Sequence, residues 1–359
     1  MRLDPRTDRR WDAFVRDHPD GLIYHHPNWL RVLTSEYGAD PVGLACVDLR
    51  GELRGVLPLL PTRGLPLASG PRTTRRLSSL PRTPVAGPLA LDDAARRHLV
   101  QAALELVQQD PGTRLEIKAP APLSISAAAG LRKTPWRLSY SLALPADPST
   151  LRFGDSRNHG RIRWALNKAQ KLGVRVRPAE STDDLRRWYA IHLQTMRWHS
   201  VPPRPFRLFQ AMWDILRPAG QMQLLLAEQH DGGQTRLLAG SVFLMQGQTV
   251  FYAFNGCWRW AMPLRANDVI QWEAIHDAVL KGFRHYDLGE VEEQQEGLHE
   301  FKSKWGAHAS RLYRYYDPAA DVRSGQRGSK GQGRVAKIAW QRMPPSLTAL
   351  LGDKLYGYM

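Results

Sequence analysis

The stretch "MQLLLAEQHDGGQTRLLAGSVFLMQGQTVFYAFNG", residues 222–256, predicts three consecutive antiparallel strands. Apolar runs rich in Leu, Val and Phe are separated by "DGG" and "QGQ", which are short glycine-containing turns that favour hairpins. A sheet of this kind has to bury its faces against other elements, so the flanking sequence should supply helices and further strands.

Both flanks supply such elements. Ile162, Ala165, Leu166 and Ala169 form one helical stripe that ends at Gly173, a natural C-terminal stop. Thr182 is expected to cap a second helix, and Asn267 a later one, because their side-chain oxygens can accept from free amides. From residue 174 the predicted order is a strand, two helices, the three strands, a helix, a strand at 285–291, a helix at 296–306 and a strand at 310–317.

This is the element order of the acyltransferase fold shared by GCN5-related N-acetyltransferases, and the first half of the chain repeats it more faintly. We therefore predict an α/β protein with two tandem acetyltransferase-like (GNAT) domains, whose mixed, mainly antiparallel sheets are flanked by helices. The predicted division is an N-terminal domain at 1–148, a C-terminal domain at 149–318 that contains "FKSKWG", and a basic linker and tail at 319–359.

Length and composition agree with two domains and limit the class of protein. The 359 residues exceed one typical domain of roughly 100–200 residues, and 43% hydrophobic residues are enough for two cores. The longest apolar stretch, "LLAGSVFLM", is much shorter than the ~18 residues of a membrane span, and the N-terminus lacks the apolar run of a signal peptide. Cys46 and Cys257 allow at most one disulfide and give no zinc or redox spacing. We expect a cytoplasmic protein without a metal.

Basic residues are concentrated in three segments of a chain whose formal net charge is +16. Residues 152–177 contain eight Arg and Lys against Asp155 alone, and the segments 54–82 and 323–342 are also basic. Such density can attract a polyanion, or it can form a solvated surface.

Four stretches carry a resemblance to a known family. They are "IYHHPNWLRVL" at 23–33, "SRNHGRIRWALNKAQKLGVRVR" at 156–177, "PLRANDVIQWEAIHDAVLKGFRHYDLGEV" at 263–291 and "EGLHEFKSKWGAHASRLYRYYDP" at 296–318. Together they resemble the FemAB-type aminoacyltransferases, which build peptidoglycan interpeptide bridges. The resemblance implies a substrate channel in the cleft of a tandem pair of domains. It also implies transfer of an aminoacyl group from aminoacyl-tRNA to an amine of a lipid-linked or nucleotide-linked muropeptide precursor, with no metal or bound organic cofactor.

Lys302 is the catalytic residue that the resemblance implies, because it matches the lysine that the family uses near the reacting centre. An amine that attacks an ester creates an oxyanion, and one preorganised donor near that oxygen contributes roughly 3–4 kcal/mol in other enzymes. Phe301 and Trp305 are expected to fix the helix and contact substrate, and Gly306 to permit a tight turn. The alternative is a lysine on an amphipathic helix whose charged end lies in water.

Further binding residues are hypotheses with plain alternatives. Arg157, Arg161 and Arg163 are candidates for tRNA or precursor phosphates, since guanidinium groups suit phosphate oxygens, or they form a solvated helix face. Other substrate-binding candidates are Arg265, Tyr286 and Arg31; Tyr286 is equally a core residue, and Arg31 stands where some family members have a lysine. The nearest acids in sequence are Asp287, Glu290, Glu292 and Glu293, and none of them is assigned as a general base.

Two other function classes stay open. One is an acyl-CoA-dependent N-acyltransferase that acts on exopolysaccharide or cell-envelope amines; "NGCWRWAMPLRANDV" at 255–269 has no glycine run for a CoA pyrophosphate. The other is a non-catalytic scaffold that binds RNA or an anionic membrane. The tail from 334 carries apolar residues that could contact the inner membrane surface peripherally, although Pro344 and Pro345 should break any long helix there.

Overall fold

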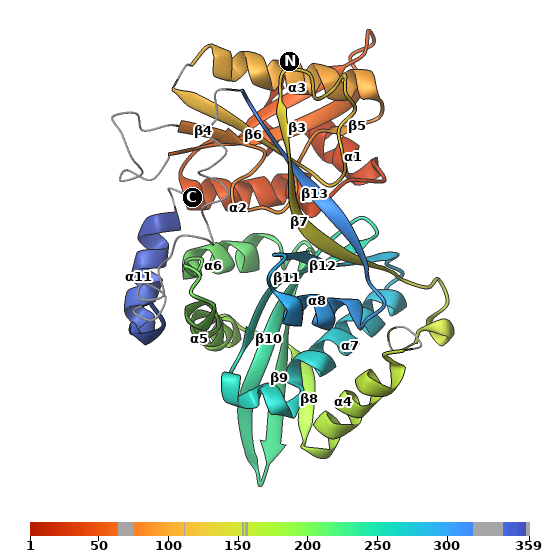
Figure 1. Ribbon diagram of the computed structural model, residues 1–359, viewed down its shortest axis with the longest axis vertical. Helices are drawn as coiled ribbons and strands as arrows, with labels where there is room; N and C mark the ends of the chain where they lie inside the picture. The colour runs from red at the N-terminus through yellow and green to blue at the C-terminus, as the bar shows by residue number, and fades with distance from the viewer. Residues whose placement is uncertain (64–74, 111, 153, 155–156, 319–339, 357–359) are drawn as a thin grey trace. The chain divides into compact units, whose positions relative to one another are not determined.

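The computed structural model describes residues 1–63, 75–110, 112–152, 154, 157–318 and 340–356 (Figure 1). The chain forms two compact units. The first comprises Met1–Arg137, a return segment that begins at Arg311 and the chain end from Gly352; the second comprises Leu138–Ser310 and Trp340–Leu351. The basic segment at 323–342 lies outside the described residues up to 339.

The first unit is a mixed sheet with helices, and its last strand, β13, follows the main part of the second unit in sequence. The sheet order is β1-β2-β3-β4-β6-β13, and β5 pairs with β3. In β13, Tyr313–Tyr316 pair antiparallel with Glu116–Ala119 of β6. The bounds are β1 Arg2–Leu3, α1 Arg9–Asp17, η1 Ile23–His25, α2 Pro27–Tyr37, β2 Val42–Val47, β3 Leu53–Arg63, β4 Arg75–Ser78, β5 Leu89–Ala90, α3 Asp93–Gln108, β6 Thr113–Ala119 and β13 His308–Tyr316.

The predicted C-terminal domain extends to residue 318. In the structure the second unit comprises Leu138–Ser310 and Trp340–Leu351, and the part of β13 from Arg311 onward belongs to the first unit. The physical reason is burial. Tyr315 is fully buried in the apolar cluster of the first unit, beside residues of α3 and β6. A strand that contributes such a side chain belongs to the core it fills.

From residue 174 to residue 303 the second unit has the predicted order of elements, and the last predicted strand is β13 of the first unit. The sheet order of the second unit is β7-β12-β11-β10-β9-β8, antiparallel throughout except for the parallel pair β11–β12. The predicted mixed α/β fold class is confirmed. The bounds are β7 Arg132–Ala143, η2 Pro148–Thr150, α4 His159–Lys171, β8 Val174–Pro178, α5 Thr182–His199, α6 Phe206–Ile215, β9 Met222–Asp231, β10 Gln234–Gln246, β11 Thr249–Cys257, η3 Arg259–Leu264, α7 Ala266–Leu280, β12 His285–Val291, α8 Glu296–Ser303 and α11 Pro345–Tyr356.

Alternation along the strands separates the two faces of this sheet. Leu225 and Ala227 of β9 belong to the core cluster that also contains buried residues of α4 and α7. On the opposite face, Trp188 of α5 donates from Nε1 to the carbonyl of Gly240 at 2.8 Å. A Cβ at Gly240 would lie 2.5 Å from the Trp188 ring, so only glycine allows α5 to pack this closely.

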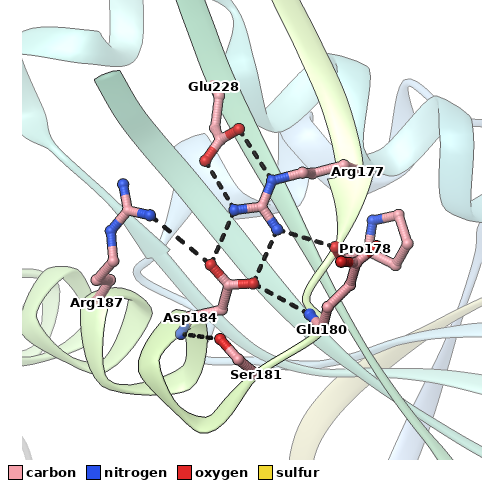
Figure 2. Close-up of polar contacts among 7 residues, drawn as sticks. All are labelled: Arg177, Pro178, Glu180, Ser181, Asp184, Arg187 and Glu228. Atoms are coloured by element: carbon pink, nitrogen blue, oxygen red, sulfur yellow. Dashed lines mark hydrogen bonds and ion pairs between the residues drawn. The ribbon is translucent and has the colours of Figure 1, made fainter. Parts of the chain in front are cut away.

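Arg177 joins three elements of this unit, β8, α5 and β9, through a partly buried ion-pair cluster (Figure 2). Its guanidinium donates to both carboxylate oxygens of Asp184 at 2.8 Å and to both of Glu228 at 3.0 Å. The bonds from Arg177 hold the pKa of Asp184 at about 2. Arg177 was counted in the basic segment 152–177, but two carboxylates already neutralise it. The helix cap here is Ser181, whose hydroxyl accepts from the Asp184 amide at 3.2 Å, one residue before the predicted Thr182.

The tail residues that the structure describes form α11, which begins at Pro345. Proline is tolerated in the first turn because its missing N–H would have no partner there. Residues just before α11 contact α5, since Arg197 donates to the Met343 carbonyl at 3.1 Å and Gln341 to the Trp198 carbonyl at 2.8 Å. Among the described helices, none is both long enough and apolar enough to cross a bilayer.

Candidate active site

The strands β11 and β12 separate at the point where the candidate site begins. They pair only over Thr249–Phe251 and His285–Asp287. Beyond these residues β11 continues along β10, and β12 continues along β7 with a register shift between Asp287 and Gly289. Gly289 has φ +79°, a conformation that favours glycine. A bulge of this kind bends a strand, so the two backbones diverge after their last shared pair.

The side-chain amine of Lys302, a residue of α8, lies at the point where the two strands diverge. The residue is 5% exposed, and its Nζ donates to the carbonyl oxygens of Gly289 at 2.9 Å and Glu290 at 3.1 Å. The alternative of a lysine whose charged end lies in water is therefore wrong for this structure. Trp305 is 2% exposed and Gly306 has φ +83°, so the expected packing and tight turn are both present.

The electrostatics of this site are those of a buried charge with nearby acids. Burial lowers the pKa of Lys302 to about 8, while the carboxylates of Asp287 and Glu290 oppose that shift. Burial also raises the pKa of Asp287, against the Gly289 amide, which donates to its Oδ1 at 2.6 Å, and against the Lys302 charge. With a pKa of about 8, roughly nine-tenths of the Lys302 amines carry a proton at pH 7. The amine is thus mostly a cation that is shielded from solvent.

Two neighbouring helices hold α8 in place. Lys304 at its C-terminal end forms an ion pair with Asp268 of α7, and its Nζ lies 4.5 Å from the centroid of the half-buried Phe301 ring. Arg161 of α4 donates to Glu300 of α8 at 2.6 Å. A Cβ at Gly154 would lie 2.1 Å from the Lys304 carbonyl oxygen, so the chain before α4 also passes close to this end of α8. These contacts fix the helix that carries Lys302.

Of the predicted substrate-binding residues, some lie near Lys302 and others do not. Phe301 and Trp305 flank Lys302 on the same segment. Tyr286 is fully buried, and its hydroxyl donates to Gln271 Oε1 at 2.8 Å, which places it in the core. Arg31 belongs to α2 of the first unit, where its guanidinium donates to Asn28 Oδ1 at 2.8 Å and to the Arg6 carbonyl at 2.6 Å.

Arg265 lies at the N-terminus of α7, whereas the cap was expected two residues later. It occupies the residue before α7 with φ +63°, and α7 begins at Ala266, so the prediction that Asn267 caps this helix is wrong. The Arg265 guanidinium lies 5.0 Å from the ring centroid of Trp164, an exposed side chain on α4. Trp164 was not among the predicted site residues, although its spacing from Arg161 already placed both on one side of a helix. Arg157, which lies two residues before α4, and Arg163, which lies within it, are both exposed.

Parallel strands that diverge beside a buried lysine, with helices on both faces of the sheet, define the second unit as an acetyltransferase-like domain. Consistent with this, residues 156–303 match the family described as Acetyltransferase (GNAT) domain. No curated protein matches the sequence.

Several solved structures share the fold of the chain. FemX is similar with a TM-score of 0.67 and 17% identity over 88% of this chain and 96% of FemX. The C-terminal domain of a candidate lysylphosphatidylglycerol synthetase from Agrobacterium fabrum is similar with a TM-score of 0.57 and 14% identity over 88% of this chain and 93% of that domain. A tandem GNAT protein from the clavulanic acid biosynthesis pathway gives a TM-score of 0.52 and 13% identity over 89% of this chain and 99% of that protein. The FemAB-type resemblance is thereby confirmed at the level of the fold, and these findings support an acyltransferase.

Proposed function

We propose that the protein transfers an aminoacyl group from aminoacyl-tRNA to an amine of a peptidoglycan precursor peptide. The observation that carries this proposal is the buried Lys302 amine at the divergence of β11 and β12. A cation held by two backbone carbonyls and shielded from water can move toward an oxygen that becomes negative. The likeness to FemX supports an aminoacyl rather than a simple acetyl donor.

In the proposed reaction, the acceptor amine attacks the ester carbon that joins the amino acid to the tRNA ribose. The carbonyl oxygen gains negative charge, and Lys302 stabilises it by hydrogen bonding and by charge, an effect strengthened where water is excluded. The tetrahedral intermediate then expels the ribose hydroxyl, which takes up a proton as the acceptor amine loses one. Phe301 and Trp305 position the lysine through their packing against the same segment.

The connection between β11 and α7 disfavours CoA as the donor. A CoA pyrophosphate would need free backbone amides at this place. Here η3 contains Pro263, which has no N–H, and the amides of Ala261 and Arg265 donate to the carbonyls of Trp258 and Met262. These two amides are therefore used within the connection, which weighs against the acyl-CoA-dependent alternative.

A lipid-linked acceptor would bring the protein to the inner membrane surface. In α11 the side chains of Leu347 and Leu350 are 42% and 51% exposed, so they are available for peripheral contact with a bilayer. This contact is part of the proposal and is tested separately from transfer.

The test of the proposed function is a comparison of donors with one acceptor. Purified protein is incubated with a lipid-linked muropeptide and either a mixed charged-tRNA pool or acetyl-CoA, and the product is identified by mass spectrometry. We expect the mass of an added amino acid with charged tRNA and none with deacylated tRNA. A product that forms only with acetyl-CoA would contradict the proposal and favour the N-acyltransferase alternative.

A further inference from the structure

The outward face of α4 carries a row of cations interrupted by one aromatic residue. Arg161, Trp164, Lys168 and Lys171 follow one another at intervals of three, four and three residues, which places them on one side of a helix. We call this row the α4 stripe. The opposite side of α4 is apolar and buried through Ile162, Ala165 and Ala169. The stripe is therefore the solvent side of a helix whose apolar side belongs to the core.

Trp164 is unusual among these residues because a large aromatic ring stays 54% exposed between two cations. The Arg265 guanidinium lies 5.0 Å from its ring centroid and the Lys168 Nζ 5.3 Å. Arg265 reaches the ring from a left-handed backbone position at the start of α7. Among the described residues, its Nε has no hydrogen-bond partner. The indole is thus held at the surface with positive charge beside it.

The charge of Arg161, the first cation of the stripe, does not serve the stability of the helix, whereas Lys168 and Lys171 lie in the last turn, where the helix dipole favours cations. The described α4 has no acidic residue in its first turn and no side-chain cap, and Arg161 lies near the N-terminal end, where the helix dipole disfavours a cation. One carboxylate, Glu300 of α8, pairs with Arg161 at 2.6 Å, but both side chains are more than 60% exposed. An exposed pair of this kind contributes little to stability. The same contact places the stripe beside the helix that carries Lys302.

We propose that the α4 stripe binds the unpaired 3′ end of an RNA, with one base stacked on Trp164 and phosphates on Lys168, Lys171 and Arg161. This proposal rests on the proposed function, in which that RNA is the charged tRNA. Exposed aromatic rings among cations are the recurring means of holding single strands, since every base can stack and every phosphate is negative. A membrane is the weaker occupant, because an interfacial helix needs an apolar face toward the lipid and the apolar side of α4 is buried.

The test measures the equilibrium binding of a fluorescent five-nucleotide RNA that ends in ACCA. A blunt RNA hairpin and anionic phosphatidylglycerol vesicles serve as competing probes. Trp164→Ala should weaken oligonucleotide binding about fivefold to 100-fold, the range typical of one lost base stack, and Trp164→Phe should restore most of it. Lys168→Ala with Lys171→Ala should lower the slope of log affinity against log salt by about 0.7 for each lost phosphate contact. Arg236→Ala, an exposed cation on the β9–β10 hairpin, is the matched control and should change neither quantity.

Several outcomes would overturn the inference. They are oligonucleotide binding that Trp164→Ala leaves unchanged, equal or tighter binding of the blunt hairpin, or binding of vesicles without binding of RNA. Thermal unfolding of each variant shows whether the fold is kept, which the exposure of Trp164 leads us to expect. No aminoacyl group is transferred in these measurements. Loss of RNA binding in Trp164→Ala would therefore support the stripe even if the transfer assay failed.

Discussion

The burial of Lys302 has a measurable effect on stability that is independent of catalysis. Its pKa is lowered from 10.5 to about 8, mainly by burial. Carrying the charged amine in the folded protein therefore costs roughly 3 kcal/mol at pH 7. Because the folded pKa lies below the unfolded one, the unfolded chain holds more protons between these values. The penalty is therefore complete below pH 8 and is relieved as pH rises toward 10.5.

The perturbation is Lys302→Met, which keeps the length of the side chain and removes the titrating amine. Between pH 7 and pH 9.5 the folded wild-type protein should gain about 2 kcal/mol of unfolding free energy relative to the variant. Ionisable groups that do not interact with Lys302 titrate alike in both proteins, so they cancel in this difference. Lost packing and lost hydrogen bonds to Gly289 and Glu290 shift the variant equally at both pH values.

The assay is urea unfolding of both proteins at pH 7.0, 8.5 and 9.5, followed by circular dichroism. Lys281→Met is the matched control, because Lys281 is half exposed and paired with Asp277 at 2.6 Å. Its difference from wild type should stay nearly constant over this range. A Lys302→Met difference that is also constant with pH would refute the argument that the amine is buried and its pKa lowered.

Three further predictions follow from other contacts. Gly289→Ala should lower the unfolding free energy by about 1–2 kcal/mol and reduce transfer. The backbone at φ +79° strains any residue that has a Cβ, and the new methyl group would lie 3.7 Å from the Lys302 amine. Equal activity of the variant would count against a site at this bulge. Arg177→Met should lower the unfolding free energy in urea by about 3 kcal/mol, because two nearly buried carboxylates lose their partner. Arg187→Met, at an exposed side chain, should lower it by less than about 1 kcal/mol. Similar losses in the two variants would contradict this ranking. Aspartate at both Leu347 and Leu350 should reduce cosedimentation with anionic vesicles, and unchanged cosedimentation would remove α11 from the proposed membrane contact.

Much of the fold could be predicted from the sequence because short-range patterns of apolar residues and glycines determine it. The hairpins between β9, β10 and β11 follow from short glycine turns, and the helices α4, α5 and α7 follow from apolar spacing. The caps were less predictable. Ser181 and Arg265 occupy the cap positions that were expected at Thr182 and Asn267, because backbone geometry and packing decide between adjacent residues.

Contacts between residues that are distant in sequence could not be predicted from local patterns. Tyr315 fills the core of the first unit although it follows the second unit in sequence, and only strand pairing across some 200 residues reveals this. For the site, the resemblance singled out Lys302, but its burial and its two carbonyl partners depend on the bulge at Gly289. Arg177 looked like part of a basic surface because its partner Glu228 is distant in sequence.

The most direct test of the central claim is single-turnover transfer from charged tRNA to a lipid-linked muropeptide by wild type, Lys302→Met and Lys281→Met. If Lys302 stabilises the oxyanion, its loss should slow the chemical step at least about 100-fold, while tRNA affinity and the Lys281→Met rate stay near wild type. A Lys302→Met rate within a few fold of wild type, with charged tRNA bound and the protein folded, would contradict the account.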